Sequence, residues 1–195
     1  MGQQDSSPDA ERFLEGKLLI AMPGMSDPRF EKTVIFMCAH SGEGAMGLIV
    51  NKPVDGIGFR ELIRQWELGI TAHTPDLPVL FGGPVQTGRG FVLHSSDYEG
   101  KESTMPVAND VSLTATLDIL KAIASGHGPQ KAIFALGYAG WGPGQIENEI
   151  RAAGWIHCDA DDAILFGPDM QSKWNLALAK LGINLSGLSV HAGRA

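Results

Sequence analysis

Apolar and polar residues follow one another along this chain in a pattern that predicts strands first, and then strands alternating with helices. Short apolar runs bounded by glycine, proline or polar residues predict strands at residues 17–22, 33–40, 45–50, 78–81, 90–94, 131–136 and 155–158. The tight polar turn from Ser41 to Gly44 indicates that the second and third of these strands form an antiparallel hairpin.

Helical periodicity appears in four other segments. Phe59, Leu62, Ile63 and Trp66 form one apolar stripe within residues 58–67. Further helices are expected from Asn109 or Asp110 to Ser125, over residues 143–153, and after Asp169, whose side chain is the expected cap of the last helix. This order of elements favours an α+β domain with a mixed sheet over a doubly wound parallel fold.

The domain is expected to occupy residues 13–183, because no linker or change of composition interrupts them. Residues 1–12 are polar and without periodicity, which predicts a disordered tail. Residues 184–195 show no clear element, so their order stays open.

Charge and composition argue against several classes of protein. The 195 residues carry a net charge of -7, with no run of basic residues, which disfavours direct binding to nucleic acid. No apolar stretch approaches the ~20 residues of a membrane span, and the polar N-terminus does not resemble a signal peptide. With only two cysteines there is no disulfide framework. Together these features predict a cytoplasmic protein.

The richest candidate for chemistry is the glycine-rich segment from Gly137 to Gly144, which is expected to join a strand to a helix. Such a loop can hold an anion on backbone N–H groups. It lacks the spacing of a Walker or dinucleotide-binding loop, and Glu147 and Glu149 just beyond it would repel a phosphate. We therefore favour a tight turn with Trp141 in the core over a ligand loop.

Cysteine and histidine occur together twice. Cys38 and His40 are two residues apart on an expected strand and should share a face, whereas His157 and Cys158 should point to opposite faces. The spacing matches no common zinc pattern. Buried thiols beside satisfied histidines are favoured here over redox or metal chemistry.

Two other polar runs are favoured as ordinary turns. His94 to Asp97 contains the residue types of a hydrolase triad, but neighbours at a strand end rarely converge and no nucleophile elbow is present. Asp159 to Asp162 resembles the start of a calcium loop, yet Ile164 and Met170 stand where glycine and glutamate are required. We predict no metal site and no cofactor.

Several segments taken together resemble the YqgE/AlgH family over about residues 13–183. They are residues 18–25, 27–30, 38–40, 47–53, 81–85 and 137–147, in this order. The resemblance implies a bacterial, cytoplasmic, single-domain α+β protein with a partly barrel-like mixed sheet surrounded by helices. Some members of the family carry the label of transcriptional regulator. The resemblance identifies no catalytic residues. The positions shared with the family motifs are Pro23, Gly24, Asn51, Pro53, Gly83, Pro84, Gly137, Gly140 and Trp141.

These observations favour a non-enzymatic binding or regulatory domain that acts through an unknown protein partner or small ligand. Since no helix-turn-helix with a basic second helix is apparent, regulation of transcription would be indirect. The alternative is an enzyme with its site at the loops around residues 51, 83 and 137–144. In either case we expect a cleft where turns follow strands, with the candidate ligand-binding residues Asn51, Gly83, Pro84, Gly137, Gly140, Trp141 and Gly142.

Overall fold

The computed structural model describes residues 13–98, 100, 103–108 and 110–185. The tail expected at residues 1–12 and most of the C-terminal segment lie outside this part of the chain. Within it the strands are β1 (Lys17–Ala21), β2 (Val34–Ser41), β3 (Gly44–Ile49), β4 (Val79–Phe81), β5 (Val85–Ser95), β6 (Thr104–Ala108), β7 (Val111–Thr114), β8 (Ala132–Trp141) and β9 (Trp155–Asp159).

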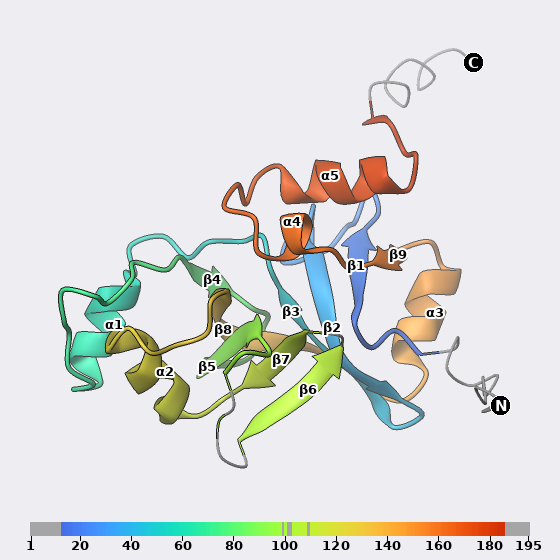
Figure 1. The fold of residues 1–195 in the computed structure, drawn as a ribbon. Helices are drawn as coiled ribbons and strands as arrows, with labels where there is room; N and C mark the ends of the chain where they lie inside the picture. Colours follow the sequence, from blue (N-terminus) through green and yellow to red (C-terminus); the bar gives the residue numbers. More distant parts are fainter. Residues whose placement is uncertain (1–12, 99, 101–102, 109, 186–195) are drawn as a thin grey trace, which may run out of the picture.

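The strands form one sheet in the order β6-β7-β5-β8-β3-β2-β1-β9, and β4 pairs with β8 beside this path. All neighbours are antiparallel except β4 and β8, which are parallel. The sheet curls into a half-barrel surrounded by helices (Figure 1). This confirms the predicted α+β class with a partly barrel-like mixed sheet, and the β2–β3 pairing confirms the hairpin.

The helices cover three sides of the curled sheet. They are α1 (Phe59–Gln65), α2 (Leu117–Ala124), α3 (Gln145–Arg151), α4 (Asp162–Leu165) and α5 (Lys173–Lys180). Residues from most strands pack with α4 and α5 in the largest cluster, which we call the barrel core. A second cluster contains Ile146 of α3, and a third contains residues of α1 and α2 with part of the sheet. Each helix therefore buries an apolar stripe against the sheet.

The helix predicted from residue 109 or 110 to 125 is wrong over nearly its first half. Val111–Thr114 is strand β7, Leu113 packs in the barrel core, and the helix begins only at Leu117, which is 52% exposed. Leucines at 113, 117 and 120 fit a helical period, but pairing with β5 and β6 decides for strand. The prediction also missed β6, which contains Pro106 and lies at the edge of the sheet, where proline is tolerated.

The glycine-rich loop predicted at residues 137–144 is also largely wrong, because residues 137–141 continue β8. Glycine is needed there for close approach of two backbones. A Cβ on Gly137 would lie 2.4 Å from the carbonyl oxygen of Gly83, and Gly137 has a φ of 72°. Only residues 142–144 connect β8 to α3, so the segment is a strand with a short connection.

Near the C-terminus the helix caps differ from the prediction. Ser172, not Asp169, precedes the last helix, although the Asp169 carboxylate accepts the backbone N–H groups of Gln171 and Ser172. The predicted acidic turn at residues 159–162 instead leads into α4, where Asp161 accepts the N–H of Ile164 at 2.9 Å.

Candidate functional site: a tryptophan cleft

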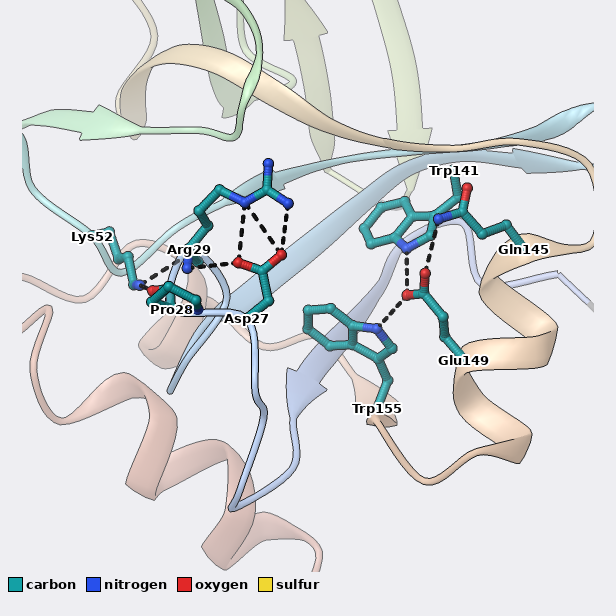
Figure 2. Close-up of polar contacts among 8 residues, drawn as sticks. All are labelled: Asp27, Pro28, Arg29, Lys52, Trp141, Gln145, Glu149 and Trp155. Atoms are coloured by element: carbon teal, nitrogen blue, oxygen red, sulfur yellow. Dashed lines mark hydrogen bonds and ion pairs between the residues drawn. The ribbon is translucent and has the colours of Figure 1, made fainter.

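A cleft of about 410 Å³ lies where β8, β9 and α3 meet the loop that follows β1. We call it the tryptophan cleft, because Trp141 from the end of β8 and Trp155 from the start of β9 form part of its wall (Figure 2). Its other lining residues are Met25, Asp27, Arg29, Phe30, Pro84, Gly140, Gln145, Glu149, Ala152 and Gly154.

One carboxylate organises the two tryptophans. Oε2 of Glu149 accepts the indole N–H of Trp141 at 2.9 Å and that of Trp155 at 2.8 Å. Its other oxygen, Oε1, accepts the side-chain amide of Gln145 at 2.8 Å, one helical turn earlier on α3. Both indole N–H groups therefore have a partner, and both rings are held in place by a single helix residue (Figure 2).

Aromatic contacts extend the wall. The rings of Trp141 and Trp155 meet edge to face, with centroids 6.0 Å apart, and Phe30 meets Trp155 in the same way at 5.7 Å. Such edge-to-face pairs are favourable because the positive edge of one ring meets the negative face of the other. The wall is thus rigid and apolar, with a carboxylate at its base.

An ion pair stands on the opposite side of the cleft (Figure 2). Nε and Nη2 of Arg29 donate to the carboxylate of Asp27, with an Nη2–Oδ2 distance of 2.7 Å. The side-chain hydrogen bond from Arg29 lowers the pKa of Asp27 below its usual value, and the same bond raises the pKa of Arg29. The guanidinium also lies over the Phe30 ring, 5.7 Å from its centroid.

The structure brings most of the predicted site residues to this end of β8. Pro84, Gly140 and Trp141 line the tryptophan cleft. The backbone N–H of Gly142 donates to Oε1 of Gln145 at 3.0 Å. Gly83, in the connection between β4 and β5, lies against Gly137 and Tyr138 of β8, and the two backbones leave no room for side chains at Gly83 and Gly137.

Asn51 lies elsewhere. Its Oδ1 accepts the N–H of Val34 and its Nδ2 donates to the carbonyl of Lys32, each at 2.8 Å. It lines a separate hollow of about 630 Å³, together with Lys52 and Trp174 among others. Its amide is therefore engaged with the backbone that enters β2, and it is absent from the lining of the tryptophan cleft.

Sequence reasoning did not select Asp27, Arg29, Glu149 or Trp155 for the site. One signal was available, because Gln145 and Glu149 stand four residues apart on a predicted helix and so share a face. No sequence rule indicates that Trp155 shares the carboxylate of Glu149 with Trp141. That contact depends on β9 returning to the sheet beside β1.

A wider groove of about 620 Å³ also includes Gly140 and Trp141 in its lining. It crosses β3, β5 and β8, with Glu43, Arg89 and Tyr138 around it. The guanidinium of Arg89 lies over Phe91, 5.2 Å from the ring centroid. The tryptophan cleft has the denser set of fixed polar contacts, so we take it as the candidate site.

The cysteines and their neighbouring histidines do not form a common site. A β-bulge lies between Met37 and Ala39 in β2. Cys38 packs in the barrel core on one side of the sheet, whereas the ring of His40 accepts the backbone N–H of Leu14, which belongs to the second cluster. The prediction that Cys38 and His40 share a face is therefore wrong, because the extra residue of the bulge reverses the alternation.

Burial raises the pKa of the Cys38 thiol to about 12 and also raises that of Cys158. Both are free thiols. His157 is exposed beside the buried Cys158, so these two neighbours do point to opposite faces. Among the described residues no group of three or more histidine, cysteine or acidic side chains is arranged to hold a metal ion.

The side chains of His94, Ser95 and Asp97 do not form the hydrogen-bonded chain of a hydrolase triad. His94 is buried, which lowers its pKa, and its Nε2 is hydrogen bonded to Oγ1 of Thr114 at 2.8 Å. Ser95 instead donates to Asp97. The histidine and the serine hydroxyl thus have different partners.

Fold and site together define an α+β half-barrel protein with a preformed aromatic cleft at the end of its central strands. No helix in the described part of the chain has the length and apolar character needed to cross a membrane. The profile of the AlgH-like family (DUF179) matches residues 18–186. The chain belongs to this family.

Relatives and solved structures agree with that assignment. A UPF0301 protein of Afipia carboxidovorans is 53% identical, covering 98% of this chain and 95% of the relative. The solution structure of the AlgH protein from Pseudomonas aeruginosa is 41% identical, with a TM-score of 0.77 over 99% of this chain and 100% of that one. A crystal structure from Corynebacterium diphtheriae, 19% identical, has the same fold with a TM-score of 0.68 over 92% and 90% of the two chains.

Proposed function

We propose that this protein is a binding domain with a regulatory role, and that the tryptophan cleft receives a small ligand or a segment of a protein partner. The observation that carries the proposal is the single carboxylate of Glu149, which accepts the indole N–H groups of both Trp141 and Trp155. A wall fixed in this way needs no ordering when a ligand arrives, and such preorganisation increases affinity.

Size and chemistry support the same role. A volume of about 410 Å³ falls in the range of small-molecule sites, which are mostly apolar with a few fixed polar groups. Asp27 and Glu149 already accept hydrogen bonds from fixed protein donors. Proton transfer in an enzyme needs a group free to exchange a proton with substrate, whereas recognition is served by groups held in one geometry.

Any effect on transcription would run through the bound partner or ligand. The net charge of -7 opposes direct association with a phosphate backbone. Two free, buried cysteines suit the reducing cytoplasm, which is where we place the protein.

The test is a binding screen on the whole chain, followed by the indole N–H signals of Trp141 and Trp155 in NMR spectra. The screen uses a mixed panel of small cations, anions and neutral compounds. Ala152→Trp places bulk in the cleft lining, and Asn148→Trp places the same bulk on an exposed position of α3 outside it.

We expect at least one compound to shift both indole signals in the wild type and in Asn148→Trp, and not in Ala152→Trp. A panel that leaves both signals unmoved contradicts the proposal. Chemical conversion of a bound compound would instead support the enzymatic alternative.

A further inference from the structure

The charges around the tryptophan cleft indicate which ligands it selects. The charged residues in its lining are Asp27, Glu149 and Arg29, which gives two carboxylates against one guanidinium. Asp27 and Arg29 pair with each other at 2.7 Å. The partners of the Glu149 carboxylate are two indoles and an amide, all of them neutral donors. The cleft therefore keeps one negative charge that its own hydrogen bonds do not neutralise.

That charge lies among aromatic rings. Trp141 and Trp155 both contact Glu149 through their N–H edges, and Phe30 packs against Trp155. The faces of such rings are electronegative and attract cations, most strongly where water is excluded. Trp141 and Trp155 are only 7% and 4% exposed, so the parts of their rings that line the cleft add to the attraction of the carboxylate for a positively charged group with apolar surface.

The protein already places one cation in this way. The Arg29 guanidinium lies over Phe30 while it pairs with Asp27, so the rim of the cleft combines a carboxylate and a ring around a positive group. The neighbouring Lys52 is not in the lining, and its ammonium donates to the carbonyls of Pro28 and Arg29 behind the ion pair (Figure 2). After the hydrogen bond from Arg29, the charge of Lys52 also helps to lower the pKa of Asp27. An anionic ligand would meet two carboxylates, and Nε and Nη2 of the one guanidinium in the lining are already occupied.

We infer that the cleft binds an alkylammonium or guanidinium group on an aliphatic stem, which enters between the Asp27–Arg29 pair and the two tryptophans. This inference rests on the proposed binding function and adds the chemical class of the ligand. The group can belong to a small molecule or to a basic side chain of a partner, since both present the same cation. A cleft of about 410 Å³ has room for such a head group and its stem.

The experiment compares ligands of equal shape and different charge by titration of the full chain. Choline and 3,3-dimethylbutan-1-ol share one shape, but only choline is charged. A capped Gly-Arg-Gly peptide and its citrulline analogue test the guanidinium in the same way. At least one charged probe should bind about tenfold more tightly than its neutral counterpart. Binding of choline alone would indicate a small ligand, and binding of the peptide alone a basic side chain.

The second part of the experiment compares binding of the charged probe to variants of the protein. Glu149→Gln should weaken the charged probe about tenfold, whereas Glu61→Gln, an equal charge change on the exposed surface of α1, should have no effect. Arg29→Ala frees Asp27 and should tighten binding about threefold, while Asp27→Asn frees Arg29 and should weaken it. These two exposed or half-exposed loop residues give an answer even if Glu149→Gln does not fold.

Equal binding of charged and neutral probes would overturn the inference, and so would weaker cation binding in Arg29→Ala. If neither cation binds but an anion or neutral compound of the screening panel shifts the indole signals, the ligand class is wrong and the binding function stands. If no compound of any charge moves those signals, both fall.

Discussion

Lys173 and Glu149 are charged side chains whose hydrogen bonds go to neutral partners, and they differ in what lies beyond them. Lys173, at the start of α5, is only 1% exposed and donates to the carbonyls of Val50 at 3.1 Å and Leu165 at 2.8 Å. Glu149 accepts two indoles and an amide, but it lines an open cleft. The comparison separates a charge that joins elements of the fold from a charge that a ligand can reach.

Burial accounts for the difference in expected behaviour. Lys173 joins the start of α5 to the end of α4 and to the residue after β3, so its hydrogen bonds are sealed from water. Removal of such a donor leaves buried carbonyls without a partner. Around Glu149, water in the cleft can replace part of what a substitution removes. Stability should therefore depend more on Lys173, and recognition more on Glu149.

The largest effect is expected from Lys173→Met. It keeps the bulk of the side chain but leaves the carbonyls of Val50 and Leu165 unpaired, which should lower the free energy of unfolding by about 3 kcal/mol at pH 7. Urea denaturation measures this loss. The control is Lys180→Met on the same helix, where the ammonium pairs with Asp161 near the surface and the loss should stay below about 1 kcal/mol. Equal losses in the two variants would break the comparison.

Glu149→Gln should lower the free energy of unfolding by about 1–2 kcal/mol, because the amide has one acceptor oxygen where the carboxylate has two. Chemical denaturation gives the loss, and the indole N–H signals of Trp141 and Trp155 should move together in the NMR spectrum. A loss as large as that of Lys173→Met would mean that the cleft residue is as structural as the buried lysine.

The pH dependence sharpens the contrast further. Burial lowers the pKa of Lys173 to about 8, below its value in the unfolded chain. Between these two values the unfolded state binds more protons, so the wild type gains stability from Lys173 as pH rises. The stability gap between wild type and Lys173→Met should therefore widen by about 1 kcal/mol from pH 7.5 to 9. A gap that narrows over this range would contradict the buried-charge interpretation.

The smallest change is expected at Cys38, which is 1% exposed and lies in the barrel core. Its thiol, with a pKa raised to about 12, should not react with a thiol reagent at pH 7.5 until the chain unfolds. The labelling rate in native buffer and in urea measures this. Rapid labelling of the Cys38 thiol in native buffer would show that the barrel core opens to solvent. It would then weaken the claim that the hydrogen bonds of Lys173 are closed to water.

The sequence indicated some of the residues that line the tryptophan cleft, but not how they contact one another. Trp141, Gly140 and Pro84 were selected because turns follow strands there, and all three line the cleft. Glu149 was noted only as an acidic residue near a helix start. Its role depends on two tryptophans that reach it from different strands, and side-chain convergence of this kind is not encoded in local spacing.

The sequence by itself determined the elements whose signal is local. Runs of apolar residues gave β1, β2, β3 and β9 to within one or two residues, and the helical stripe around Phe59 gave α1, since burial on one face leaves a period in the chain. Composition and charge by themselves also disfavour a disulfide framework and a broad nucleic-acid surface.

Tertiary structure decided whatever depends on a partner distant in the chain. Val111–Thr114 is a strand because β5 and β6 pair with it, and Gly137 lies within a strand because β8 pairs with β5 on both sides of it. The bulge in β2 separates Cys38 from His40, and the return of β9 beside β1 brings Trp155 to Glu149. In each case the deciding energy is a contact between segments far apart in sequence, which local propensity does not contain.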